Sequence, residues 1–172
     1  MKKIIFSLLS VSFFLFSCGE SAIEVNKEIV LQVEKVNVLM SEVTQHISAD
    51  EYDLAKSKID SLTAQVASSE EALKTITYSK AGVYKQSAID YVAFIGKDAP
   101  GKLGKAIEIF EAAKLREQAD VASGKQSATM INSGPDFDEA RNLLKDFRKD
   151  LKKVHEVLAD KQEKFLTANG IK

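Results

Sequence analysis

The chain contains few of the residues that interrupt helices or cross-link a fold. Its 172 residues include two prolines, one cysteine and no tryptophan. A single cysteine excludes a disulfide within the chain. With 24 basic and 25 acidic residues the formal net charge is −1, so the chain lacks the positive excess on which nucleic-acid binding depends, and we expect no nucleic-acid partner. The abundant residues are Ala, Glu, Lys, Leu and Val, a composition that favours helices.

The longest apolar run lies at the N-terminus. Two lysines precede an apolar segment over residues 4–16, and Ser17 and Cys18 follow it. This order of basic, apolar and small residues is typical of a secretory signal peptide. The segment is shorter than the roughly 20 residues that a membrane-spanning helix needs. We therefore predict an export signal over residues 1–17.

The end of this region, LFSC, resembles the lipobox of bacterial lipoproteins. Leu15 stands three residues before Cys18, and the small Ser17 directly precedes it. The resemblance implies cleavage before Cys18, a diacylglycerol thioether on its sulfur and usually a third acyl chain on the new amino group. Two or three chains hold a protein on a membrane, whereas one is marginal. The alternative is an ordinary signal peptide with an incidental cysteine.

The residues after the cysteine bear on location and domain organisation. Gly19 occupies the position at which some bacteria place an aspartate that retains lipoproteins in the inner membrane. The resemblance therefore favours the outer membrane, and it leaves open whether the protein faces the periplasm or the cell surface. We expect residues 18–21 to be the lipidated cysteine with a short tether, and residues 22–172 to form one domain.

Four stretches of this domain carry apolar residues at alternating steps of three and four, and in the third stretch the pattern stops at Ile95 and resumes at Leu103. Such spacing lays one apolar stripe along a helix and leaves polar residues on its other face. The stripes consist of Ile29, Val33, Val36, Met40, Val43 and Ile47; of Tyr52, Ala55, Ile59, Leu62, Val66, Ser69, Leu73 and Ile76; of Tyr84, Ala88, Tyr91, Ile95, Leu103, Ile107 and Phe110; and of Phe137, Ala140, Leu144, Phe147, Leu151, Val154 and Leu158. The pattern predicts an all-α fold, specifically an antiparallel up-and-down four-helix bundle.

Two serines are expected to begin helices. Ser21 with Glu24 and Ser48 with Glu51 both match the capping box, in which serine and glutamate satisfy free backbone N–H groups of the first turn. The second match predicts a tight turn near residues 48–50, which makes the first two helices antiparallel.

The last helix has a marked start and end. Pro135 is expected in its first turn, and Gly170 follows its end. Residues 120–134 are short of large apolar side chains and rich in Ser, Ala and Gly, so they are predicted to form the one long loop.

The stretch GKDAPGKL, residues 96–103, matches the G-x-x-x-x-G-K part of a phosphate-binding loop. However, Leu103 stands where that loop needs a Ser or Thr hydroxyl for Mg²⁺, and no partner strand is predicted. Apolar residues on both sides keep helical spacing. We therefore expect no nucleotide, and we predict a third helix with a kink or break at residues 97–101, caused by Pro100.

No pattern predicts catalysis, a metal or a cofactor. Glu42 and His46 lie four residues apart, whereas di-iron bundles use Glu-x-x-His, so a solvated ion pair is the simpler interpretation. Met40 and His155 could pair as haem ligands. However, Met40 lies about 10 Å from the top of its helix and His155 about 30 Å from the top of its own. The two are therefore not expected to be level, and Met40 is interpreted as a core residue. The chain has no G-x-S-x-G motif, although triads that form only in space stay open.

Two functions remain open. The first is a non-enzymatic, lipid-anchored interaction or structural protein with an envelope or extracellular protein partner. The end of the bundle farthest from the membrane is its candidate binding tip, which consists of Ser48, Asp50, Tyr52, Lys125 and Met130. The helix layout and the ending KFLTANGIK are similar to small four-helix surface lipoproteins of unknown function. That resemblance implies a location and no activity.

The second function is a small-ligand carrier. Its candidate pocket lies where Pro100 disturbs the third helix, beside Tyr84 and Tyr91.

Overall fold

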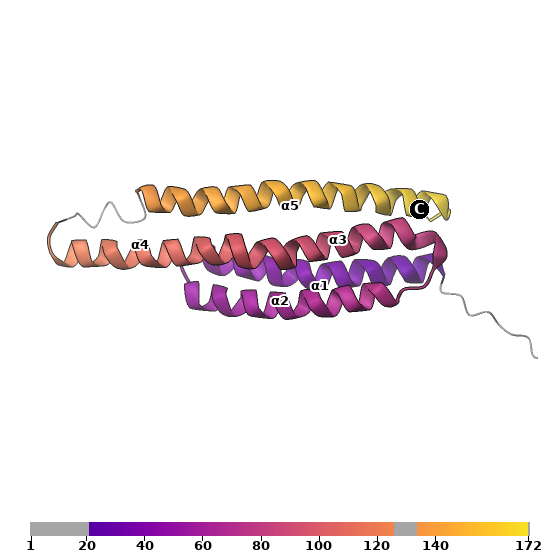
Figure 1. The fold of residues 1–172 in the computed structure, drawn as a ribbon, viewed down its shortest axis with the longest axis horizontal. Helices are drawn as coiled ribbons and strands as arrows, with labels where there is room; N and C mark the ends of the chain where they lie inside the picture. The colour runs from indigo at the N-terminus through magenta and orange to yellow at the C-terminus, as the bar shows by residue number, and fades with distance from the viewer. Residues whose placement is uncertain (1–20, 126–133, 172) are drawn as a thin grey trace, which may run out of the picture.

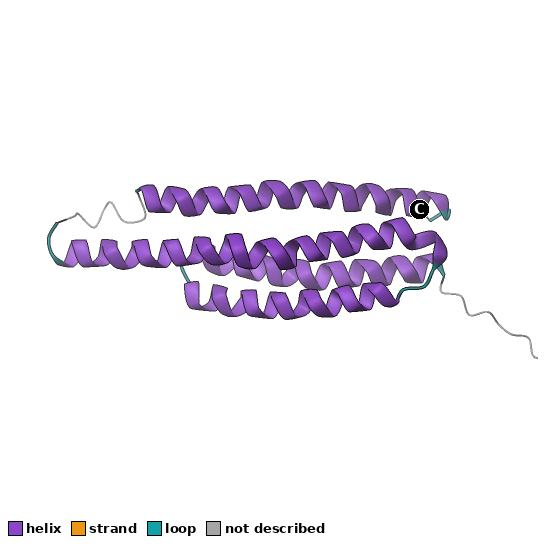
Figure 2. Cartoon of the chain, viewed as in Figure 1, coloured by secondary structure: helices purple, strands orange, loops and turns teal. Residues whose placement is uncertain are grey.

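The computed structural model describes residues 21–125 and 134–171, and every regular element in these ranges is helical (Figure 2). The predicted all-α class is therefore confirmed for the described residues. Cys18 and Met130 lie outside them. Within the same ranges, no helix is both long enough and apolar enough to cross a membrane.

Seven helical segments follow one another along the described chain. They are α1 (Ala22–Ser48), α2 (Tyr52–Thr75), the 3₁₀ turn η1 (Ser79–Ala81), α3 (Gly82–Asp98), the π-helical turn η2 (Ala99–Leu103), α4 (Gly104–Ala122) and α5 (Pro135–Ala168). Because α3, η2 and α4 follow each other without a gap, the described residues form four long helical segments (Figure 1).

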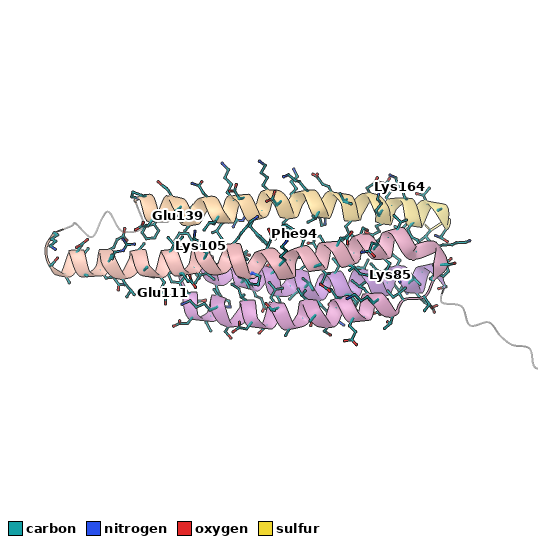
Figure 3. All side chains as sticks on the ribbon, in the orientation of Figure 1. Lys85, Phe94, Lys105, Glu111, Glu139 and Lys164 are labelled. Atoms are coloured by element: carbon teal, nitrogen blue, oxygen red, sulfur yellow. The ribbon has the colours of Figure 1, made fainter. Side chains whose placement is uncertain are left out.

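The four segments lie side by side along the longest axis of the molecule (Figure 1). α1 packs mainly on α2, and α2 packs on α3, while α5 lies along α3 and α4. Aromatic and ionic contacts join α5 to that long helix. Phe94 of α3 stacks on Phe147 of α5 with ring centroids 6.0 Å apart, and Lys105 of α4 lies 3.4 Å from Glu139 of α5 (Figure 3). By contrast, α1 and α5 make few contacts with each other.

The first predicted capping box is confirmed. The Glu24 backbone N–H donates to Ser21 Oγ at 3.2 Å, and the Ser21 N–H donates to a Glu24 carboxylate oxygen at 2.9 Å. Ser21 holds the pKa of Glu24 below its usual value, chiefly because the Glu24 carboxylate accepts the hydrogen bond from the Ser21 backbone N–H. A favourable carboxylate in the first turn helps to fix the start of α1 at Ala22.

The second predicted capping box is wrong. Ser48 belongs to α1, where its hydroxyl donates to the Thr44 carbonyl at 2.8 Å instead of accepting from α2. A serine side chain near a helix end can bond to the preceding turn, and here that bond competes with capping. α2 begins after Glu51, which makes no side-chain cap, and the turn passes through Asp50 with a φ of 60°.

At the predicted kink or break in the third helix the structure has an irregular turn, and the helix does not break. The chain stays helical through η2, whose wider turn includes Pro100 and lets the Gly104 N–H donate to the Ala99 carbonyl five residues earlier. Proline lacks an N–H and its ring clashes with the carbonyl four residues before it. Widening the turn by one residue accommodates the proline without ending the helix.

The predicted stripes of α2 and of the α3–α4 helix are buried along their whole length. The stripes of α1 and α5 are not. Val33 and Met40 of α1, and Leu144, Leu151 and Val154 of α5, are only partly buried. The partly buried apolar residues of the predicted stripes therefore lie on α1 and α5, the two helices that make few contacts with each other.

A candidate binding groove between α1 and α5

Two adjoining hollows lie along α5, and together we call them the groove; the first lies between α1 and α5, and the second between α3 and α5. The first, the valine hollow, has a volume of about 350 Å³. It is lined by Val30, Val33, Glu34, Asn37, Tyr84, His155, Leu158, Ala159 and Gln162. The second, the basic hollow, has a volume of about 240 Å³. It is lined by Tyr91, Arg148, Leu151, Lys152 and His155. His155 belongs to both hollows, so they meet at its side chain.

Two tyrosines of α3 form the polar part of the groove floor. The Tyr84 hydroxyl donates to Asn26 Oδ1 at 3.1 Å, and Gln162 Nε2 of α5 donates to the same oxygen at 3.1 Å. The Tyr91 hydroxyl donates to Asn37 Oδ1 at 2.6 Å. Asparagines of α1 thus accept from the tyrosine hydroxyls, and the floor is held in place before any ligand arrives.

Burial at this floor changes the acidity of the two phenols. It raises the pKa of Tyr84 above its usual value. It also raises the pKa of Tyr91, although the hydrogen bond to Asn37 opposes the shift. Both hydroxyls are therefore neutral hydrogen-bond donors at physiological pH.

Charge is distributed unevenly around the groove. Arg148 and Lys152 of α5 line the basic hollow, and Glu34 of α1 lines the valine hollow. Among the described residues Arg148 and Glu34 have no ion pair, and Lys152 is 3.8 Å from the exposed Glu156. His155 stands between the two ends, with its ring 5.9 Å from that of Tyr91 in an edge-on arrangement.

The structure brings two of the three predicted pocket residues into one groove. Tyr84 lines the valine hollow and Tyr91 the basic hollow. Pro100 lies in η2 and lines neither, so the groove results from the separation of α1 and α5 and not from a broken third helix.

The expected difference in height between Met40 and His155 is wrong. His155 contacts Tyr91, whose hydroxyl binds Asn37 of α1, so His155 lies about one turn from the level of Met40. The ends of α1 and α5 are therefore not level. Within the described residues, no three His, Cys, Asp or Glu side chains are grouped so that they could hold a metal ion. Glu42 instead lies 2.7 Å from Lys58 in an ion pair.

The described residues of the candidate tip do not all lie together, because they stand at two different levels along the helix axes. At the α1–α2 turn, Asp50 accepts a hydrogen bond from the Tyr52 hydroxyl at 3.0 Å and pairs with Lys114 of α4 at 3.2 Å. From Lys114, α4 continues for about 12 Å to Ala122, and Lys125 follows its end. Figure 1 shows α4 extending beyond the end of α1 and α2. Ser48, Asp50 and Tyr52 therefore lie together, and Lys125 lies apart from them.

A third hollow of about 270 Å³ lies beside that turn. It is lined by Ile47, Ser48, Asp50, Tyr52, Phe110, Phe137, Arg141 and Leu144. The Tyr52 ring stacks on Phe110 with centroids 6.1 Å apart, and Arg141 lies over Phe137. The first of these contacts fixes the turn against α4, and the second lies within α5.

Most of the polar groove residues were not predicted from the sequence to line a binding site. Asn26 and Asn37 flank the α1 stripe, and Arg148, Lys152 and His155 recur at steps of four and three beside the α5 stripe. The row on α5 could have been recognised in the sequence, because basic side chains at this spacing share one side of a helix.

No protein-family model, no curated protein and no solved structure matches the chain, so comparison with known proteins indicates neither a family nor a function. The described residues form an all-helical protein with a groove between its first and last long helices.

Proposed function

We propose that this is a lipid-anchored, extracytoplasmic helical protein that binds other molecules without catalysis. The observation that carries the proposal is the position of LFSC and Cys18 directly before the start of α1. Only Gly19 and Glu20 separate the cysteine from the helix cap at Ser21, a tether of about 10 Å. A domain on so short a tether would stand against the lipid headgroups. The glycine after Cys18 supports the outer membrane.

We further propose that the four helical segments form an antiparallel up-and-down bundle. The short turn between α1 and α2, together with their extensive packing, supports opposite directions for that pair. For α1 and α5, residue numbers run in opposite senses along the groove. Gln162 bonds to Asn26, whereas the lower-numbered His155 lies near the level of Asn37.

An envelope or extracellular protein is the partner class that we propose for the first function. In the bundle described above, the α1–α2 turn points away from the anchored start of α1. Asp50 and Tyr52, held there by Lys114, would meet such a partner early.

A second candidate function, a small-ligand carrier, is favoured by the groove. Its larger hollow falls within the range of about 300–1,000 Å³ that is usual for small-molecule sites. Its walls are mainly apolar, with a few fixed polar groups, which is the usual composition of such sites.

The anchor is tested by expressing Cys18→Ala in the native host. Metabolic labelling with a fatty-acid analogue is expected to mark the wild type and not the variant, and the variant should leave the membrane fraction. Ser21→Ala is the matched control, which should keep its label. A labelled Cys18→Ala protein would show that the lipid is attached elsewhere.

Native mass spectrometry of protein purified from that host separates the two functions. A stoichiometric small molecule supports the carrier, and a protein that co-purifies stoichiometrically supports the interaction protein. Protease treatment of whole cells, compared with lysed cells, then distinguishes the surface from the periplasm.

A further inference from the structure

We propose that the groove binds a small amphipathic anion of the fatty-acid type, with its apolar body in the valine hollow and its carboxylate in the basic hollow. The inference rests on the carrier function proposed above and adds the chemical class of the ligand.

Val30, Val33 and Leu158 form the apolar surface for the body of the ligand. These residues line the valine hollow, and Val30 is 37% exposed although it faces other apolar side chains there. Covering such surface stabilises a complex in proportion to the apolar area removed from water. The tyrosine hydroxyls beneath already donate to asparagine oxygens, so an apolar body would not leave these donors unpaired.

The other end of the groove carries two basic side chains that suit an anionic head group. Arg148 has no ion pair among the described residues, and Lys152 has only the distant Glu156. Both side chains are exposed, so either can turn toward a ligand. A guanidinium beside an ammonium is well suited to a carboxylate, which accepts charge-assisted hydrogen bonds from both.

The charge on α1 fixes the orientation of the ligand. Glu34 lines the valine hollow and would repel a carboxylate there, whereas Arg148 and Lys152 attract it at the basic hollow. Because both hollows include His155, one molecule can reach both. The apolar body therefore lies toward Glu34 and Ala159, and the head group lies beyond His155.

The test uses the chain from residue 18 onward with Cys18→Ser, so it does not depend on lipidation. Every buried residue of the described ranges lies between Val25 and Phe165, so this chain keeps the whole described core. Circular dichroism first checks that it is helical. The ligands are dodecanoate, dodecanol and dodecylammonium, each titrated below its critical micelle concentration and followed by calorimetry. Dodecanoate is expected to bind at least tenfold more tightly than the other two.

Two pairs of variants locate the ligand. The double variant Arg148→Gln/Lys152→Gln should weaken dodecanoate about tenfold and leave dodecanol unchanged, as expected for the loss of charge-assisted hydrogen bonds. Lys149→Gln is its control, since Lys149 is exposed and lines neither hollow. Ala159→Phe should fill the valine hollow and weaken all binding. Its control is Val157→Phe, which adds bulk at an exposed position outside the groove.

The possible failures are distinct. If dodecanol binds as tightly as dodecanoate, or the double variant binds dodecanoate normally, the anion assignment is wrong and the carrier function stands. If the folded protein binds none of the three ligands, the anion assignment is overturned and the carrier function loses its support. A dimer, detected by sedimentation, that excludes dodecanoate would assign the groove to a second copy of the chain and overturn the proposal. None of these results bears on the anchor.

Discussion

Gly96→Ala adds a methyl group where α3 packs against α2. A β-carbon built on Gly96 would lie 2.5 Å from Val66 Cγ1, well inside van der Waals contact. Val66 is buried, and a β-branched side chain in a helix has one strongly preferred rotamer, so its methyl group cannot move aside easily. The first glycine of GKDAPGKL is therefore a packing residue at a helix–helix contact.

The expected magnitude is a balance of two effects. Replacing a helical glycine with alanine stabilises a helix by up to about 1 kcal/mol. Forcing a methyl group into a filled space costs about 1–3 kcal/mol. Gly104→Ala isolates the first effect, because nothing lies within 4 Å of a β-carbon at that position of the same long helix. The free energy of unfolding of Gly96→Ala should thus be about 1–3 kcal/mol below that of Gly104→Ala.

Urea unfolding followed by circular dichroism measures this difference, and thermal melts should agree at about 2–4 °C per kcal/mol. A double-mutant cycle adds a sharper test. Removing the Val66 methyl groups makes room for the new one, so Gly96→Ala should cost less in a Val66→Ala background, with a coupling of about 0.5–3 kcal/mol. If Gly96→Ala stabilises the protein as much as Gly104→Ala does, the close approach of the two helices is refuted.

Two further predictions concern the core and the groove floor. Leu62→Asp should lower the free energy of unfolding by more than about 4 kcal/mol, because Leu62 is fully buried. Leu151→Asp should lower it by less than about 2 kcal/mol, because Leu151 is only partly buried at the groove. Equal losses in urea unfolding would contradict an open groove. Because burial raises the pKa of Tyr84 and Tyr91, their contribution to stability is complete below about pH 10, where free tyrosine ionises, and it is lost as the pH rises through the higher folded pKa values. Thermal melts between pH 9 and 11 should show this loss of stability with rising pH. Tyr84→Phe and Tyr91→Phe should each make the loss smaller. A loss that is unchanged in both variants would exclude these tyrosines as its source.

Sequence periodicity predicted α2 and the α3–α4 helix most accurately, since every residue of their two stripes is buried. α2 packs on both α1 and α3, so its apolar face is fully covered and the pattern corresponds directly to burial. The same pattern in α1 overstated the burial of Val33 and Met40. Whether α1 meets α5 depends on the packing of segments about a hundred residues apart in sequence, and no local pattern reports that.

The end of α1 was mispredicted for a local reason. Ser48 can cap the next helix or bond back to Thr44, and both choices satisfy one backbone group. The capping-box pattern cannot decide between them.

The groove was only half predictable. Aromatic spacing located Tyr84 and Tyr91 on one side of the third helix, and the structure places both in the groove. Pro100 lines neither hollow, because the helix continues through it although proline usually interrupts helices. The basic row on α5 gained meaning only once the exposed side of that helix was known.

The π-turn at η2 also bears on how the sequence can change in evolution. One row of buried positions in this helix, Tyr91, Ile95, Ala99, Leu103 and Ile107, recurs at four successive steps of four. In a regular α-helix each such step turns the buried face by about 40°, so the stripe would drift round the helix away from α5. The wider turn absorbs one residue and keeps both halves facing the same neighbours. A homologue that lacked one residue of this turn could close it to a regular α-helix and retain the same core on either side, whereas a deletion within α3 would rotate every core position beyond it. Length variation among homologues is therefore expected at η2 before any other place in the long helix.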